Sequence, residues 1–200
     1  MNRTPPNWKS FCTEPSQIQA AAQRIRSLVI ETPTILFESL SRDVGCSVAL
    51  KCENFQHGFA FKARGACNAV FSLTDEEASR GVVTHSSGNH AAALARAAQL
   101  RGIKAHIVMP QNSAKVKLAA VRSLRIEPVM CGPTPAAREA MAEEVMQTTG
   151  ATMIHPFNNA QVIAGQGTVG LEILRQHPDV ETIVVPVGGG GLLAGVLIAV

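Results

Sequence analysis

Lys62 stands in an unusual setting for a lysine, within the stretch GFAFKARGACNAV at residues 58–70. Phe59, Ala60 and Phe61 precede it, and small residues follow it. An amine in apolar surroundings has its charged form disfavoured, so its pKa falls and the neutral nucleophile becomes available. A neutral lysine amine can form a Schiff base with an aldehyde. The alternative from this stretch alone is a lysine at the start of a helix whose amine extends into solvent.

Four successive glycines follow the apolar run VETIVVPV: Gly188, Gly189, Gly190 and Gly191. Each glycine costs about 0.5–1 kcal/mol of backbone entropy relative to alanine, so four exceed what a plain turn requires. Backbone N–H groups at such a turn can surround a phosphate, which also benefits from the dipole of the following helix. We therefore expect a phosphate site, with a merely tight turn as the alternative.

The stretch from Gly189 to Ala194 also fits the G-x-G-x-x-A fingerprint of dinucleotide-binding proteins. The fit is weak, because the turn lies far from the N-terminus and the acidic residue expected about 20 positions later would lie past Val200. A P-loop is excluded, since no G-K-[ST] follows the glycines. Lys62 and the four glycines together indicate binding of a phosphorylated aldehyde.

A second turn, THSSGNHA, contains Ser86, Ser87, Gly88 and Asn89 between a predicted strand and a predicted helix. Backbone N–H groups at a helix start carry partial positive charge, so this turn suits a carboxylate or a phosphate. An ordinary helix cap, which contributes about 1 kcal/mol, is the alternative. Ligands of open α/β sheets bind beyond the carboxyl ends of the strands, where both turns are expected.

The elements that must position these turns follow from the pattern of apolar residues. Helices are expected over residues 14–29, 62–73, 88–102, 113–124, 133–150, 162–176 and 192–200. Extended segments are expected over residues 31–37, 46–53, 81–86, 104–110, 125–130, 151–156 and 180–187. Strands that alternate with helices of ten or more residues indicate parallel βαβ units and an α/β fold. Pro128 favours an edge position for its strand.

The composition excludes several classes of protein. The net charge of +3 is too small to indicate binding to nucleic acid or to an anionic membrane. No apolar run reaches the about 18 residues of a membrane-spanning helix, and no secretory signal is visible, so a cytoplasmic protein is expected. The five cysteines are scattered without a C-x-x-C, which indicates free thiols in a reducing compartment. The histidines have no metal-ligand spacing, so no metal site is assigned.

The apolar helix GLLAGVLIAV reaches Val200 without a capping residue. Its last carbonyl groups and its apolar face would lack partners. The pattern predicts that these residues form the front part of a longer protein, and that alone they would be a poor catalyst.

Four stretches resemble the motifs of one family: ENFQHGFAFKARGACNAV, THSSGNHAAALA, HPFNNAQVIAGQGTVGLEI and VVPVGGGGLLAG. Their order and spacing along residues 15–200 resemble those of the pyridoxal-phosphate enzymes of the tryptophan synthase β type. Within that family the likeness is to serine racemases and serine/threonine dehydratases. The resemblance implies pyridoxal 5'-phosphate as the cofactor, a small amino acid such as serine or threonine as the substrate, and a homodimer if the chain were complete.

The resemblance also implies roles around the cofactor. Lys62 would carry the Schiff base and would take the α-proton from one face of the bound amino acid. Phe61 would wall the cofactor ring, and Asn89 would hydrogen-bond the hydroxyl group of that ring. The four glycines from Gly188 to Gly191 would hold the phosphate.

Further roles concern the substrate. The residues that would surround its carboxylate are Ser86, Ser87, Gly88, Asn89 and His90. Ser87 would also return a proton on the face opposite Lys62, because serine racemases have serine there and threonine dehydratases often have alanine. Arg138 would lie near the substrate entrance.

Several features depart from the pattern of the family. Residues 58–60 are Gly-Phe-Ala where the family has Thr-Gly-Ser or Thr-Gly-Ala, so a bulky Phe59 replaces a glycine near the cofactor. Asn158 and Asn159 replace an acidic pair that is common in dehydratases. The partner of the pyridine nitrogen and the ligands of a possible divalent cation would lie beyond Val200.

These observations lead to one expected architecture and a leading function. A smaller α/β domain, residues 82–153, would be inserted into a larger domain formed by residues 1–81 and 154–200, with the cofactor in the cleft between them. The expected activity is serine racemisation with serine/threonine dehydration beside it. The alternatives are dehydration without racemisation, and an inactive family member that only binds partner chains. A nicotinamide-binding protein would leave Lys62 unexplained.

Overall fold

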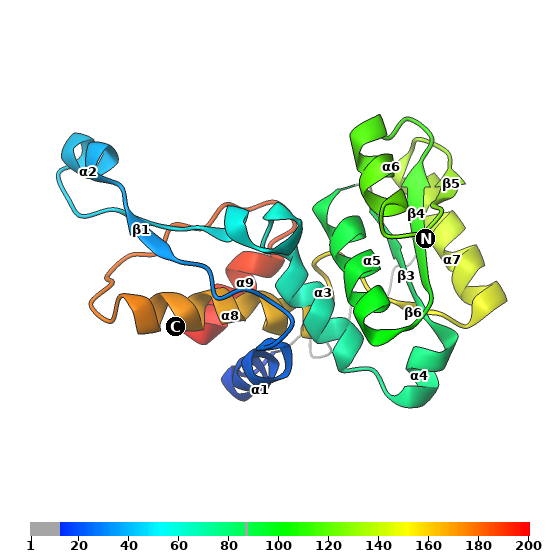
Figure 1. Cartoon of the computed structure of the whole chain (residues 1–200), viewed down its shortest axis with the longest axis horizontal. Coiled ribbons are helices and arrows are strands. Elements are labelled where there is room, and N and C mark those ends of the chain that lie inside the picture. The colour runs from blue at the N-terminus through cyan, green and yellow to red at the C-terminus, as the bar shows by residue number, and fades with distance from the viewer. Residues whose placement is uncertain (1–12, 87) are drawn as a thin grey trace, which may run out of the picture.

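The computed structural model describes residues 13–86 and 88–200. A parallel sheet with its covering helices lies on one side, and a group of helices with a projecting arm lies on the other (Figure 1). The α/β fold class expected from the sequence is confirmed. None of the helices among the described residues is long and apolar enough to cross a membrane.

The sheet contains four parallel strands in the order β5-β4-β3-β6. The strands are β3 (Val82–His85), β4 (Ala105–Pro110), β5 (Val129–Cys131) and β6 (Thr152–Met153). Strand β5 lies at an edge and begins directly after Pro128, which confirms the expected edge position. Because the strands are parallel, their carboxyl ends share one edge of the sheet.

Alternation along the strands builds a core on each face of this sheet. Val82 of β3 belongs to a core shared with α5 (Asn89–Arg101), whereas Val83 belongs to a core shared with α7 (Pro135–Thr149). Successive side chains of a strand point to opposite faces, so one strand contributes to both cores. The remaining helices of this part are α4 (Asp75–Arg80) and α6 (Lys115–Arg122).

The second part of the molecule is organised around α8 (Ala160–Gln176). This helix packs against α1 (Pro15–Ile25), α3 (Lys62–Phe71) and α9 (Gly191–Ala199). A Cβ placed on Gly165 of α8 would lie 2.6 Å from the carbonyl oxygen of Arg64 in α3. A Cβ on Gly167 would lie 2.8 Å from the carbonyl oxygen of Gly195 in α9. Glycines on α8 therefore allow the backbones of α3 and α9 to approach closely.

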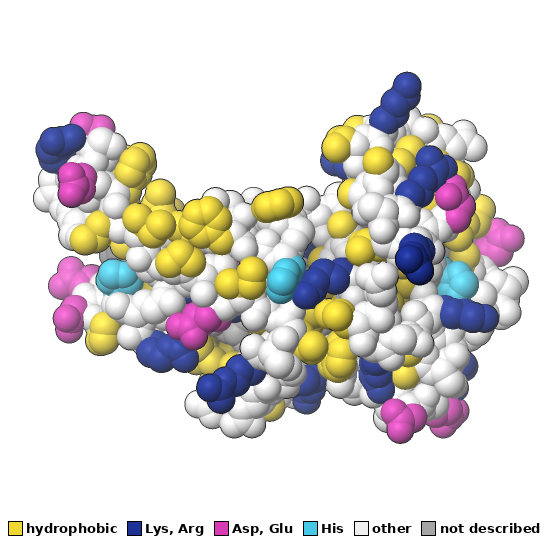
Figure 2. All heavy atoms as spheres, viewed as in Figure 1, with side chains coloured by type: hydrophobic (Ala, Val, Ile, Leu, Met, Phe, Trp, Pro, Cys, Tyr) yellow, Lys and Arg dark blue, Asp and Glu magenta, His cyan; other side chains and the backbone are white. Residues whose placement is uncertain are grey.

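The arm consists of β1 (Thr34–Leu36), α2 (Glu38–Val44) and β2 (Ala49–Lys51), and β1 pairs with β2 in antiparallel fashion. Two short 3-10 helices, η2 (Glu53–Phe55) and η3 (His57–Phe59), connect β2 with α3. Apolar side chains gather over the arm (Figure 2), among them Ile35, Leu36, Phe37 and Leu50, which are all exposed. The described residues therefore leave an apolar face of the arm open.

The structure corrects several of the expected strands, and β1, β5 and β6 are shorter than the segments expected over residues 31–37, 125–130 and 151–156. Residues 180–187 form no strand, because a strand requires a backbone partner and none of the described residues pairs with this segment. The strand expected over residues 46–53 is shorter and pairs only over Ala49–Lys51. The expected elements also omitted α2 and α4. A signal for α4 was present, because Thr74 and Glu77 form a capping box at its start.

Substitution of Gly165 by alanine should strongly destabilise the protein. The added Cβ would meet backbone atoms of Arg64 and Gly65, which cannot rotate away as a side chain could. The expected decrease in the free energy of unfolding is about 1–3 kcal/mol or more, measured by denaturant titration. Gly188→Ala is the matched control, since nothing lies within 4 Å of its added Cβ, and it should change stability by no more than about 0.5 kcal/mol. Equal stability of the two variants would contradict the tight packing of α8 on α3.

Candidate active site

Lys62 is the first residue of α3, and its side chain is half-buried. Its Nζ donates a hydrogen bond of 2.8 Å to the carbonyl oxygen of Pro156 and lies 5.1 Å from the ring centroid of Phe61. Burial lowers the pKa of Lys62 below its ordinary value. The direction of this shift agrees with the sequence prediction of an amine that loses its charge readily.

The loop that receives the Lys62 hydrogen bond also contacts the glycine turn. Nδ1 of His155 accepts hydrogen bonds from the backbone N–H groups of Phe157 at 3.3 Å and of Asn158 at 2.9 Å, which fixes the loop. The aromatic ring of Phe157 packs directly against Gly189. Lys62, this loop and the glycine turn are therefore contiguous, although they come from distant parts of the sequence.

The four glycines of the turn have two different surroundings. A Cβ on Gly189 would collide with the ring of Phe157, and a Cβ on Gly191 would lie 3.1 Å from Cβ of Phe157. Nothing lies within 4 Å of a Cβ placed on Gly188 or Gly190, and Gly190 has a φ of +83° that favours glycine. Packing thus requires two of the glycines, whereas the other two border open space at the start of α9. That arrangement fits a phosphate, which needs backbone N–H groups and room.

The turn after β3 presents the second set of predicted residues. The N–H of Ser86 donates to the carbonyl oxygen of Val108, and its hydroxyl accepts from the N–H of Gly88 at 3.3 Å. Gly88 caps α5, and Asn89 is the exposed first residue of that helix. Ser87 lies outside the described residues. The turn therefore stands at the carboxyl end of a parallel strand and at a helix start, as expected from the sequence.

His90 differs from the other predicted substrate residues because it is buried, with an exposed fraction of 2%. Its Nε2 lies 3.1 Å from the carbonyl oxygen of Ile154, and since a carbonyl only accepts, Nε2 must carry the proton. Burial lowers the pKa of His90 to about 4, and the charge of nearby Lys62 adds to this effect. Its imidazole is therefore neutral at pH 7 and ties α5 to the end of β6.

Arg138 belongs to a cluster of polar groups at the same edge of the sheet. The rings of His85 and His155 meet edge to face with centroids 5.4 Å apart. Burial lowers the pKa of His85, and Glu139 and Arg138 on α7 shift it in opposite directions. Arg138 is half-buried, and its Nε has no partner among the described residues. The charge of Arg138 thus acts on His85, which in turn contacts His155, and the sequence reasoning selected neither histidine.

Asn158 and Asn159 have different surroundings in the structure. The side chain of Asn159 accepts a hydrogen bond of 3.0 Å from the N–H of Val162 and caps α8. Asn158 is exposed in the loop beside Lys62. The replacement at position 159 is thus compatible with a helix cap, which asparagine and aspartate provide equally well.

Sequence reasoning missed Arg64, which is fully buried two residues after Lys62 and pairs with Glu53 and Glu172. The signal was an arginine within a run of small residues, a position where burial of its charge requires partners.

No group of three or more histidine, cysteine or acidic residues suited to a metal occurs among the residues the structure describes.

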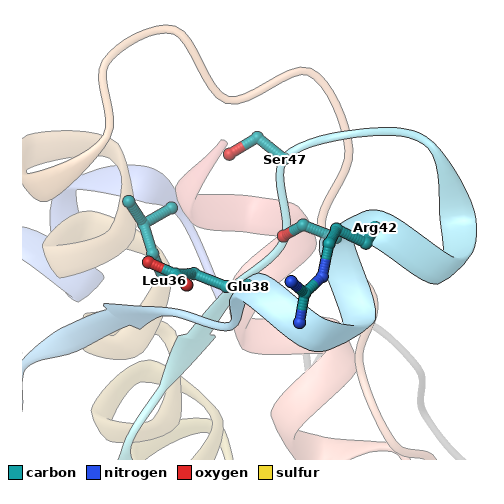
Figure 3. A pocket seen from close by; sticks show the side chains of 5 residues that line it. Leu36, Glu38, Arg42 and Ser47 are labelled. Atoms are coloured by element: carbon teal, nitrogen blue, oxygen red, sulfur yellow. The ribbon is translucent and has the colours of Figure 1, made fainter.

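A hollow of about 410 Å³ lies away from this site, on the arm. Leu36, Glu38, Arg42 and Ser47 surround it (Figure 3), and none of the residues predicted for the site lines it. It brings no nucleophile or base together with an anion-binding turn, so the candidate site remains the region between Lys62 and the glycine turn.

Comparisons with known proteins identify the family. Residues 25–200 match the family described as pyridoxal-phosphate dependent enzymes, and the chain belongs to it. A serine racemase from Oryza sativa subsp. indica is 47% identical over 189 residues, which are 94% of this chain and 56% of the relative. The chain thus spans little more than half the length of this relative.

Two solved structures confirm the expected fold of the tryptophan synthase β type. The structure of maize serine racemase superposes with a TM-score of 0.92 at 46% identity, covering 94% of this chain and 57% of that one. The structure of a threonine deaminase from T.th. gives a TM-score of 0.85 at 40% identity, covering 94% of this chain and 60% of that one. The resemblance to racemases and dehydratases stated from the motifs is confirmed.

The buried imidazole of His90 should make stability depend on pH. Its pKa is about 4 in the folded state and near 6.5 when exposed, so the unfolded state binds the proton between these values. Stability should therefore decrease as the pH falls from about 6.5 to 4, with a contribution from His90 of about 3 kcal/mol.

The measurement is the free energy of unfolding as a function of pH for the wild type and for His90→Gln, which can still donate to Ile154. The variant should lose less stability on acidification. His85, His155 and other histidines also have lowered pKa values, so the difference between the two curves is the informative quantity. Parallel curves for the wild type and His90→Gln would show that His90 is not the neutral buried group described above.

Proposed function

We propose that the protein to which this chain belongs is a pyridoxal-phosphate dependent serine racemase with serine/threonine dehydratase activity. The observation that carries the proposal is the continuity from the half-buried amine of Lys62 through the loop at Pro156 and Phe157 to the glycine turn. This continuity offers a nucleophilic amine and a phosphate site to one ligand. The similarity to rice and maize serine racemases supports the choice among the activities of the family.

Lys62 would bind the aldehyde of pyridoxal 5'-phosphate, and Gly188 to Gly191 would bind its phosphate. The lowered pKa of Lys62 supports this role, because the neutral amine is the form that attacks an aldehyde. Phe61 would pack on the cofactor ring, and Asn89 would hydrogen-bond the ring hydroxyl. When bound, the cofactor supplies an electron sink for the carbon that loses its proton.

The turn at Ser86, Gly88 and Asn89 would bind the substrate carboxylate through N–H groups at the start of α5. His90 would contribute its backbone there, since its imidazole is engaged with Ile154. Arg138 would lie near the substrate entrance, beside His85. The amine of Lys62 would remove the α-proton from one face, and the hydroxyl of Ser87 would deliver a proton to the other face. Inversion of configuration requires two such groups on opposite faces.

Dehydration without racemisation is the second candidate. The structural similarity to threonine deaminase supports it, because both kinds of enzyme share this fold with TM-scores of 0.85 or above. Both reactions begin with removal of the α-proton, so the two candidates differ in the residue that can return a proton. The identity of residue 87 as serine favours the racemase.

Other features belong to the same proposal. Residues 82–153 would form a smaller domain between the segments 1–81 and 154–200 of a larger one, with the substrate between them. A homodimer would cover the apolar face of the arm. A divalent cation would have its ligands beyond Val200, as the resemblance implies, and the free cysteines support a cytoplasmic location.

Borohydride reduction after incubation with pyridoxal 5'-phosphate should leave a pyridoxyl group on Lys62. Peptide mapping by mass spectrometry locates the label. Lys62→Arg should abolish the labelled peptide and the visible absorbance of the bound cofactor, whereas Lys117→Arg on the exposed helix α6 should retain both. Label on a different lysine, with Lys62 unmodified, would refute the assignment.

Substitution of Ser87 by alanine should separate the two reactions. Racemisation of serine should fall by about 10²–10⁴-fold, the usual contribution of a positioned acid or base, while dehydration falls much less. Both rates are measured in the full-length protein, with Ser79→Ala on the surface of α4 as the control that changes neither. An equal loss of both reactions would remove Ser87 from the proton-returning role.

A further inference from the structure

Arg64 makes an unusually complete set of contacts for a buried side chain. It lies in the first turn of α3, two residues after Lys62, and has an exposed fraction of 0%. Its Nε and Nη2 donate to the two carboxylate oxygens of Glu53 at 2.9 and 2.7 Å. Its Nη1 and Nη2 donate to the two oxygens of Glu172 at 2.6 and 2.8 Å. One guanidinium therefore holds two carboxylates, each through a pair of bonds.

The surrounding groups balance the charges of this cluster. Nζ of Lys51 lies 2.6 Å from Glu172, so two cations face two carboxylates. Thr168 accepts from Arg64 at 3.2 Å, and Thr32 donates to Glu53 at 2.6 Å. The cluster is therefore a paired buried network rather than an isolated buried charge, and a single loss would leave partners uncompensated.

The two carboxylates that bind Arg64 come from different parts of the chain, so the network links the segment before Lys62 to α8. Glu53 lies in η2, before the irregular segment that leads to Lys62, and Glu172 lies on α8. Between Glu53 and Lys62 the backbone takes left-handed conformations at Gly58 (φ 71°) and Phe59 (φ 57°). The segment contains only the two short 3-10 helices η2 and η3, so it lacks the long run of backbone hydrogen bonds that holds an α-helix or a sheet in place. Arg64, at the end of this segment, binds Glu53 at its beginning. Arg64 also binds Glu172, which holds the end of the segment against α8.

We propose that Arg64 is a positioning residue for Lys62. Its paired contacts with Glu53 and Glu172 fix the segment from residue 53 to residue 64, so that the amine of Lys62 points toward Pro156 and the glycine turn. The proposal rests on the proposed function only in taking Lys62 as the residue that binds the cofactor. Because Arg64 is fully buried among its own partners, it would act through the backbone of α3 and not by contact with substrate or cofactor.

Lysine cannot replace this arginine, although the charge is kept. An ammonium group is a point charge and cannot form two parallel pairs of bonds with two carboxylates. A hollow of about 420 Å³ between α1 and α8 borders Arg64 and Glu172, so water can reach the carboxylate of Glu172 in a variant. Arg64→Lys therefore weakens the contacts with Glu53 and Glu172 and keeps the positive charge.

The test compares Arg64→Lys with Arg122→Lys in the full-length protein. Arg122 also forms a two-oxygen contact with a carboxylate, that of Glu127, but on an exposed surface. The first readout is the pH dependence of Lys62 labelling by acetic anhydride in the cofactor-free protein, with peptide mass spectrometry and Lys117 as the internal reference. The second readout is the dissociation constant of pyridoxal 5'-phosphate, measured from its visible absorbance.

Arg64→Lys should shift the labelling profile of Lys62 to higher pH, because the amine leaves its half-buried position. It should weaken cofactor binding about tenfold or more, because a displaced Lys62 no longer lies at one end of the proposed cofactor site. Arg122→Lys should leave both readouts at the wild-type values. A variant that is less stable but keeps the wild-type labelling profile of Lys62 and the wild-type cofactor affinity would overturn the proposal.

Glu53→Gln keeps the test decisive if Arg64→Lys does not fold. It weakens the contact at the beginning of the segment while Arg64 stays paired with Glu172, and it should shift the Lys62 labelling profile in the same direction. An unchanged profile in a folded Glu53→Gln variant would also overturn the proposal. The labelling experiment needs no cofactor, so it decides the role of Arg64 even if the wild type attaches pyridoxal phosphate elsewhere and the proposed function fails.

Discussion

The close approach of α8 to both α3 and α9 is the constraint on which the candidate site depends. Gly165 brings α8 against the backbone of α3, and Gly167 meets Gly195 of α9. Lys62 is the first residue of α3, and the glycine turn ends at the first residue of α9. Two helix starts that are separated by more than a hundred residues in the chain are thereby held on either side of the loop at Phe157. A larger side chain at the contact would separate them.

The electrostatics of the site favour an anionic ligand that reacts with an amine. Lys62 is partly desolvated, which lowers its pKa, whereas the starts of α5 and α9 present N–H groups without backbone carbonyl partners in the helix. His90 is neutral because it is buried, so it adds no charge near Lys62. The full charges lie instead behind the site, in the network of Arg64, Glu53 and Glu172, where each has a partner.

The sequence predicted the parts of this structure that depend on local patterns. The parallel sheet followed from alternating strands and helices, and the lowered pKa of Lys62 followed from its apolar neighbours. The absence of a strand over residues 180–187 could not be predicted, because pairing of a strand depends on residues distant in the chain.

Contacts between distant residues account for most of what remained hidden. The hydrogen bond from Lys62 to Pro156 joins positions 94 residues apart, and the pair of Arg64 with Glu172 joins positions 108 residues apart. The four glycines indicated a ligand. Only the structure showed that Gly189 and Gly191 pack against Phe157, whereas Gly188 and Gly190 border open space. The role of Asn159 as a helix cap likewise depended on knowing where α8 begins.

The most direct test of the central claim is a crystal structure of the full-length protein with pyridoxal 5'-phosphate. If Lys62 and the glycine turn hold the two ends of one ligand, the electron density should be continuous from Nζ of Lys62 to the cofactor. Phosphate oxygens should then lie at hydrogen-bond distance from N–H groups of residues 188–191. Phosphate bound away from the glycine turn, or a cofactor with no link to Lys62, would contradict it.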